Sequence, residues 1–227
     1  MSTGNAAVSP GPIRRSALDA LHARLGARWV SGTAHWPANY GDSTREAGSA
    51  RAAAGLVDVG PVAKAGVRGP GAGPLLSGEG LQLRPGRVDG EPGSDSAQVW
   101  GMAPDEAVVL GDRATELVQR ASDGVAVVDL TSALALFRLV GPNAIEVVRS
   151  VCGLDVHPSA FAERPLSHAA VANVRCTIAR LDWAGHPAFA VLLQRDYAQY
   201  VWETLLHVGR VEGLVAIGAT ALKAGDR

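Results

Sequence analysis

Residues 125–151, VAVVDLTSALALFRLVGPNAIEVVRSV, decide the fold. An apolar run ends at Asp129, and after a polar Thr-Ser pair a second apolar run covers residues 133–140. Gly141 and Pro142 end that run, and apolar residues then recur at helical spacing as far as Val151. Short β-rich runs that are divided by Gly and Pro and followed by a 3.6-residue period are typical of strand, turn, strand and helix.

The same phrase occurs earlier in the chain. Val57-Asp58 corresponds to Val128-Asp129, and the run at residues 63–68 leads into Gly69-Pro70 as the later run leads into Gly141-Pro142. Two copies of one order of elements predict two pseudo-repeated strand–helix modules. We therefore expect an α+β fold in which helices pack on antiparallel sheet.

Further elements follow from capping residues and periodicity. We expect a first helix at 16–25 capped by Ser16, and an Ala-rich helix that starts at Ser43 and stops at Gly55. Strands are predicted within 97–110, at 171–181 and at 188–193, and the last long helix starts at Asp196. Residues 78–96 and 152–170 are predicted to be loops, because their apolar residues follow no helical or strand period.

Composition excludes several classes of protein. The net charge is −1 and no basic patch stands out, so we expect no nucleic-acid partner. No apolar run approaches the roughly 18 residues of a membrane span. Residues 1–15 lack the apolar core of a signal peptide and read as a disordered leader, which leaves 16–227 as one domain. Two cysteines, Cys152 and Cys176, are too few for a disulfide framework, so a cytoplasmic location fits best.

Motifs for chemistry are sparse. The six histidines show no HxH or HExxH spacing, so we predict no metal site. Cys152 is a nucleophile only if a base lies close, and a small buried apolar role is the alternative. Asp95 is either an electrostatic carboxylate or a solvated loop residue. Trp36 and Tyr40 either line a pocket for a planar ligand or form a hydrophobic lid, and Trp100 is expected in the core or an interface.

Several longer segments of the sequence resemble segments of known protein families. The segment 35–72, HWPANYGDSTREAGSARAAAGLVDVGPVAKAGVRGPGA, resembles the start of the glycine-cleavage T-protein (aminomethyltransferase) family. From residue 97 onward, VWGMAPDEAVVL, VVDLTSALALFRLVGP, CGLDVHPSAF and RDYAQYVWETLL are more similar to the γ subunit of heterotetrameric sarcosine oxidase. The two families share a superfamily, and together the resemblance covers nearly everything after residue 16.

The resemblance implies a T-protein-like domain of two α+β repeats around a central hole that takes tetrahydrofolate. Full-length aminomethyltransferases continue into a C-terminal barrel, and we expect this chain to lack it because the sequence stops where the first module would end.

Site residues carry over only in part. The family's active-site carboxylate falls at Asp95, our candidate catalytic residue, in the segment GSDS. The family's pteridine-anchoring Glu follows a late Phe; here Ala190 follows Phe189, so tetrahydrofolate binding should be weakened. Our candidate cofactor-binding residues are Trp36, Tyr40, Trp100 and Phe189.

Three functions stay open. The first is a sarcosine-oxidase-γ-like subunit of an amine-oxidising, tetrahydrofolate-linked assembly. The second is a stand-alone folate-dependent aminomethyl or methyl transferase, and the third is a family member repurposed for another substrate. The apolar residues Leu214, Val215, Ile217 and Leu222 predict an uncovered patch near the end of the chain, hence a partner: a flavin-containing amine oxidase subunit or a second copy.

Overall fold

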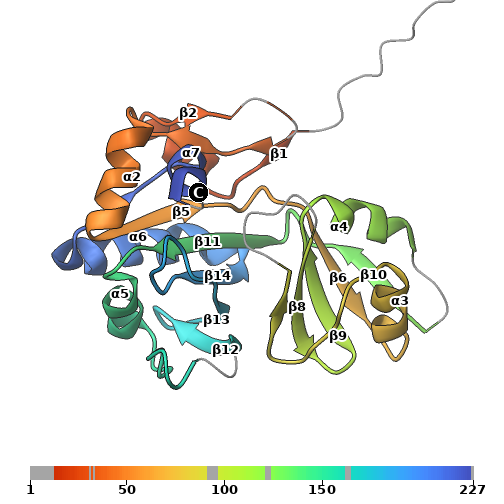
Figure 1. Ribbon diagram of the computed structural model, residues 1–227. Helices are drawn as coiled ribbons and strands as arrows, with labels where there is room; N and C mark the ends of the chain where they lie inside the picture. The colour runs from red at the N-terminus through yellow and green to blue at the C-terminus, as the bar shows by residue number, and fades with distance from the viewer. Residues whose placement is uncertain are drawn as a thin grey trace, which may run out of the picture.

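Two β-sheets lie side by side in the computed structural model (Figure 1), which describes residues 13–30, 32, 34–90, 97–120, 124–161 and 165–225. The small sheet has the strand order β10-β6-β9-β8-β7, and all its neighbours are antiparallel. Its strands are β6 (Lys64–Arg68), β7 (Val88–Asp89), β8 (Gln98–Ala103), β9 (Glu106–Leu110) and β10 (Ala126–Asp129). Helices α3 (Ala72–Gly78) and α4 (Asp112–Leu117), which continues into the 3₁₀ turn η1 (Val118–Arg120), share one apolar core with this sheet.

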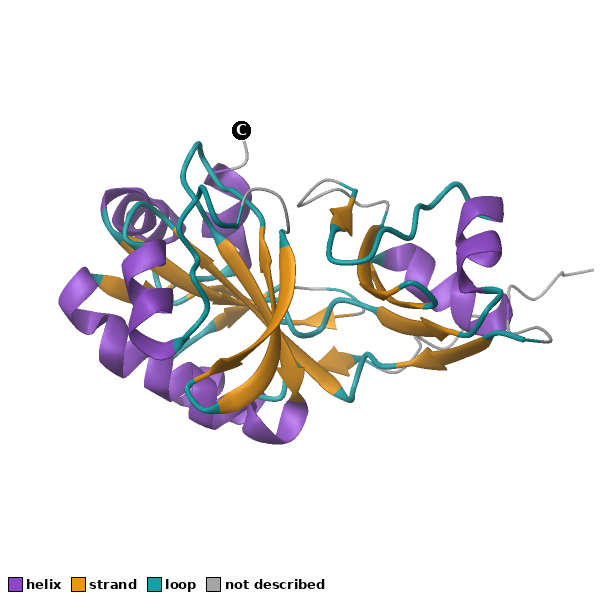
Figure 2. Cartoon of the chain, turned by 90° about the horizontal axis from the view of Figure 1, so that it is seen from below, coloured by secondary structure: helices purple, strands orange, loops and turns teal. Residues whose placement is uncertain are grey.

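The large sheet has the order β12-β13-β14-β11-β5-β15, and only the β15–β5 pair is parallel. Its strands are β5 (Ala54–Asp58), β11 (Leu134–Val140), β12 (Leu166–Val171), β13 (Val174–Arg180), β14 (Phe189–Gln194) and β15 (Leu214–Ala216). Helices α5 (Ala144–Val151) and α6 (Ala198–Gly209) pack on one apolar core of this sheet, and α2 (Ser43–Ala52) and α7 (Ala219–Gly225) on another. Figure 2 shows the helices around this sheet.

The start of the chain forms a small layer against the large sheet. It contains β1 (Arg14–Arg15), α1 (Asp19–Arg24), β2 (Arg28–Trp29), β3 (Ala34–His35) and β4 (Pro37–Asn39). β1 pairs in parallel with β3, so Arg14 and Arg15, which we had assigned to the leader, belong to a strand. Residues 1–12 of the expected leader lie outside the described residues.

The predicted repeat is confirmed in the order of its elements. β5, β6 and α3 follow one another as β10, β11 and α5 do. In each copy the first strand pairs with the second strand of the other copy, β5 with β11 and β10 with β6. Asp58 thus lies opposite Phe137, and Asp129 lies opposite Ala65. The chain therefore crosses between the sheets in both copies, which ties the sheets together.

Some boundaries differ from the prediction. β12 lies in the segment expected to be a loop, and β7 lies in the other. α1 begins at Asp19 with Leu18 as its N-cap residue, and the Ser16 hydroxyl accepts a hydrogen bond from Leu18 N at 2.9 Å and donates one to Asp58. The cap of α2 is Asp42, whose carboxylate accepts hydrogen bonds from Thr44 N and Arg45 N.

The predicted apolar patch near the end of the chain is wrong. Leu214, Ile217 and Leu222 are buried, since β15 joins the large sheet beside β5 and α7 packs against α2. Of the four apolar residues that we had singled out, only Val215 stays exposed, at 38%. This segment completes the core of the chain itself, so it gives no evidence for a partner.

Replacing Ile217 tests this packing. Ile217→Ala should lower the free energy of unfolding by about 2–5 kcal/mol, because the side chain is fully buried against α2 and β5. Urea unfolding followed by circular dichroism measures it. The matched control is Val215→Ala on the exposed side of β15, which should cost less than about 1 kcal/mol. Equal effects of the two substitutions would contradict the burial.

Candidate functional site

The face between the two sheets is where the family resemblance places the ligand. Apolar side chains from both sheets meet there in one buried cluster, the inter-sheet cluster: Trp100, Val108, Leu110, Leu136, Leu166, Ala179, Leu181, Ala190 and Leu192. Each exposes at most 8% of its surface, and Trp100, the largest, exposes none. A hollow wide enough for a ligand would leave its lining accessible to water. At these residues the sheets therefore pack on each other directly.

Ala190 stands where the family resemblance places the Glu that anchors the pteridine. Ala190 is 1% exposed and has no polar side-chain atom. Its cross-strand partner is Arg138 on β11, so the two side chains share the face of the sheet. Arg138 is 6% exposed, and its Nη2 donates a hydrogen bond to the Leu181 carbonyl at 3.2 Å. A guanidinium only donates, so it cannot replace a carboxylate that would accept the pteridine N–H groups. The residues here do not fit tetrahydrofolate.

The four candidate cofactor-binding residues do not converge. Trp100 belongs to the inter-sheet cluster. Phe189 belongs to the core under α5 and α6, because it points to the opposite face of its strand from the next residue, Ala190. Tyr40 lies against His22 in the N-terminal layer, with ring centroids 5.9 Å apart. Trp36 is half-buried beside β4. Asp95, the candidate catalytic residue, lies outside the described residues, so its role stays a prediction.

A buried polar network joins the N-terminal layer to the large sheet. The Asp58 carboxylate at the end of β5 accepts hydrogen bonds from the Ser16 hydroxyl, from Gly60 N at 2.7 Å and from His22 Nε2 at 2.9 Å. Nδ1 of the same imidazole lies 2.8 Å from the Tyr40 hydroxyl. Burial, followed by the carboxylates of Asp58 and Glu46, raises the pKa of Tyr40 above its ordinary value. The phenol therefore keeps its proton, and it donates that proton to Nδ1 in the tautomer that carries the imidazole hydrogen on Nε2, facing Asp58.

This network is built for structure rather than for nucleophilic catalysis. Ser16, His22 and Asp58 have the residue types of a hydrolase triad, but the hydroxyl of Ser16 bonds to the carboxylate and not to the imidazole. All three residues are buried, at 3%, 0% and 1% exposure. A substrate therefore cannot reach the hydroxyl, and the network anchors the first helix to the sheet.

Sequence reasoning missed Arg138, Lys64 and His22. A signal existed for the first two, since each is the one charge inside an apolar run, LALFRLV and PVAKAGV. The alternation of side chains along a strand places such a charge on a covered face of the sheet. A charged side chain that is buried there needs hydrogen-bond or ionic partners. For His22 the signal was its place on the apolar face of the predicted helix 16–25, beside Leu18, Leu21 and Leu25, where a histidine is ordinary.

Other site types find little support in the described part of the chain. No three His, Cys, Asp or Glu side chains gather there in a way that could hold a metal ion. None of the helices described is long and apolar enough to cross a bilayer. Cys152 is 7% exposed and packs in the core under α5 and α6, which agrees with the small apolar role.

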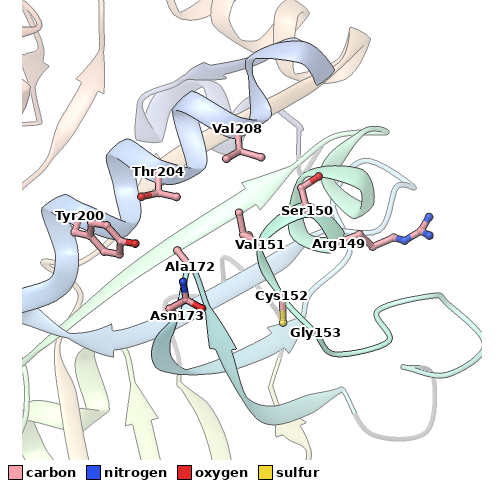
Figure 3. A pocket seen from close by; sticks show the side chains of 10 residues that line it. All are labelled: Arg149, Ser150, Val151, Cys152, Gly153, Ala172, Asn173, Tyr200, Thr204 and Val208. Carbon is pink, nitrogen blue, oxygen red and sulfur yellow. The ribbon is translucent and has the colours of Figure 1, made fainter.

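An open groove lies between α6 and the end of α5 (Figure 3). Its volume is about 470 Å³, and it is bounded by the end of α5, the β12–β13 turn and α6. Tyr200, Thr204 and Val208 face it from α6, and Arg149 extends at its rim. Tyr200 is 51% exposed.

Removing one hydroxyl tests the buried network. Tyr40→Phe should lower the free energy of unfolding by about 1–3 kcal/mol, because it leaves His22 Nδ1 buried without its donor. The matched control is Tyr200→Phe, whose hydroxyl lies on a half-exposed ring and should change stability by less than about 0.5 kcal/mol. Urea unfolding measures both, and a Tyr40→Phe variant as stable as the control would refute the network's role.

Comparisons with known proteins match this chain to relatives over most of its length. The family model described as "GCVT N-terminal domain" matches residues 107–224. Among curated proteins, the aminomethyltransferases of Geobacillus thermodenitrificans and Streptomyces coelicolor are each 29% identical over 92% and 93% of this chain. The chain spans 62% and 61% of their lengths.

Two solved structures share the fold. One is a chain of the heterotetrameric sarcosine oxidase from Corynebacterium sp. U-96, with a TM-score of 0.65 at 21% identity, covering 89% of this chain and 97% of that one. The other is aminomethyltransferase T of the Bartonella henselae glycine cleavage system, with a TM-score of 0.71 at 21% identity, covering 94% of this chain and 62% of that one. The inter-sheet arrangement and these matches lead to one assignment: the chain belongs to the family of the GCVT N-terminal domain.

Proposed function

We propose that this chain is a non-catalytic subunit of a heteromeric amine-oxidising assembly, in the position of a sarcosine oxidase γ subunit. The observation that carries the proposal is the packed inter-sheet cluster. A chain whose ligand face is filled by its own side chains performs no transfer at that face. The chain keeps the fold of the family. Without an open ligand-binding face, this fold is suited to binding another protein.

The match to the sarcosine oxidase chain supports the same proposal. That chain comes from a heterotetramer, and the match spans 97% of it. In such an assembly we expect the partner to be a flavin-containing amine oxidase subunit, which would hold the oxidative chemistry. The present chain would add surface and stability to the complex. A stand-alone folate-dependent transferase remains the alternative that the experiments below can reveal.

The outer side of α6 is the surface that we assign to this partner. Tyr197 just before α6, Tyr200, Thr204 and Val208 on α6, and Val211 in the following turn η3 (Arg210–Glu212) form one stripe, which flanks the buried face of Val201, Trp202 and Leu205. Tyr197, Tyr200 and Val211 are 49%, 51% and 86% exposed. Exposed tyrosines beside an arginine are typical of interface centres. The groove of Figure 3 adjoins this stripe.

Co-purification tests the proposal and the surface together. The chain should copurify with a flavin-containing amine oxidase subunit when it is co-expressed with its genomic neighbours. Tyr200→Glu should reduce that yield at least tenfold, because it buries an unpaired charge in the interface, which corresponds to a loss of about 1.4 kcal/mol or more.

The matched control is Gln199→Glu, which adds the same charge one residue away on the same helix at an exposed position. It should leave the yield nearly unchanged. A well-behaved monomer by light scattering that captures none of its neighbours would refute the subunit proposal. Equal yields from wild type and Tyr200→Glu would keep a subunit but refute the α6 surface.

A further inference from the structure

The edge of the small sheet at β10 is open. β10 stands at one end of the strand order β10-β6-β9-β8-β7, so one of its two sides has no neighbouring strand in the described part of the chain. The opposite edge strand of this sheet, β7, has only two residues. In the large sheet, the edge strand β12 is tied at both ends, because Leu166 N donates to the Gly86 carbonyl and Val171 forms a bridge with Cys152. The β10 edge has no comparable ties among the described residues.

The ladder between β10 and β6 shows which backbone groups point outward. Leu130 N, directly after β10, donates to the Lys64 carbonyl at 2.9 Å. Hydrogen-bonded pairs alternate with non-hydrogen-bonded pairs in an antiparallel ladder, so Val128 also bonds to β6. Val127 and Asp129 therefore direct their N–H and C=O groups away from β6. No backbone group in the described residues bonds to them there, so this edge can accept another strand.

The side chains of β10 lack the usual protection of a sheet edge. Its sequence, AVVD, contains no Lys or Pro, and its ladder with β6 has no bulge. Val128 is 54% exposed, and its cross-strand neighbour Gly66 has no side chain that could cover it. Val127 points to the other face and packs against the core under α3 and α4. Another strand beside β10 would thus remove Val128 from water and leave that core unchanged.

A second copy of the chain fits this edge in one favourable register. Two copies related by a two-fold axis bring their β10 strands together antiparallel, which is the arrangement of the whole small sheet. With the axis between the two Val128 residues, Val127 of each copy lies opposite Asp129 of the other, and their outward groups bond. The two valines then form a non-hydrogen-bonded pair, whose side chains lie close together. A register centred on Asp129 would set like charges opposite each other, and one centred on Val127 would set Val128 opposite the smaller Ala126.

We propose that β10 is the contact of a symmetric homodimer, in which the small sheets of two copies join into one continuous antiparallel sheet. Each copy brings an identical open edge, so the pairing of two copies closes both edges and leaves none for a third. The Val128-centred register satisfies the outward backbone groups, covers the exposed valines and keeps the Asp129 carboxylates apart. The inference is independent of the proposed subunit function, which uses α6.

The size of the contact sets its strength. A strand of four residues covers much less than the roughly 1,000 Å² that stable interfaces bury. The dimer should therefore be weak and reversible, with a Kd on the order of 100 µM.

Cysteine cross-linking tests the register. Val128→Cys should form a disulfide between two copies under mild oxidation, because a non-hydrogen-bonded pair brings the Cα atoms to about 4.5 Å, which a disulfide can span. The matched control is Ala126→Cys, exposed on the same face of β10, whose two copies lie about 13 Å apart along the paired strands. It should not cross-link. The native Cys152 and Cys176 are buried, so the wild type gives the background. Equal cross-linking of the two variants would overturn the proposal.

Charge swapping tests whether the occupant is a second copy. Sedimentation equilibrium of the full chain alone, from about 5 µM to about 1 mM, should show a monomer–dimer equilibrium. Val128→Lys and Val128→Asp should each weaken the dimer at least tenfold, because like charges then face each other across the axis. An equimolar mixture of the two variants should restore it. Both substitutions lie at an exposed position, so the circular dichroism spectrum should stay that of the wild type.

Two outcomes would overturn the homodimer. One is a wild-type chain that stays monomeric at about 1 mM, or a mixture that associates no better than either variant. The other is a genomic neighbour whose capture is lost in Val128→Lys while the wild type does not self-associate, since the edge would then belong to that partner. Tyr200→Glu should leave self-association unchanged, which separates this contact from the α6 surface.

Discussion

Direct apolar contact between the two sheets is the constraint on which the rest of the structure depends. Trp100 and Val108 from the small sheet meet Leu136, Ala190 and Leu192 from the large one, and all are buried. By area, burial of each valine or leucine side chain here contributes about 1.5–3 kcal/mol relative to exposure. At these residues the contact between the sheets is therefore apolar and buried.

The covalent course of the chain reinforces that contact. Because β5 pairs with β11 and β10 with β6, both connections between the sheets run beside each other. Lys64 joins them, since its amine contacts Gly60 and Val62 in one connection and Thr131 in the other. The Asp58 network attaches the N-terminal layer at the end of β5, next to the same connection. The packing of the two sheets, the course of the two connections and the contacts of Lys64 therefore depend on one another.

Much of the fold could be predicted from local pattern. The two copies of strand, turn, strand and helix carry Gly-Pro breaks and clear periods, and the hairpin of β8 and β9 has its turn at Pro104-Asp105. β12 was missed because its sequence, LSHAAV, has few β-branched or aromatic residues and is held by pairing to β13. Burial of Leu214, Ile217 and Leu222 was missed because it requires β15 to reach β5, which is far away in sequence. The arrangement of the candidate residues could not be predicted for the same reason: only the sheet register places Arg138 beside Ala190 and puts Phe189 on the other face.

Tetrahydrofolate titration tests the packed inter-sheet face most directly. Isothermal titration calorimetry of the purified chain should show no binding heat with tetrahydrofolate up to about 1 mM, a limit near −4 kcal/mol of binding free energy. The Geobacillus thermodenitrificans aminomethyltransferase, titrated in parallel, controls for ligand quality. A low-micromolar affinity of this chain that Asp95→Ala abolishes would contradict the packed face and would make it a folate-binding enzyme.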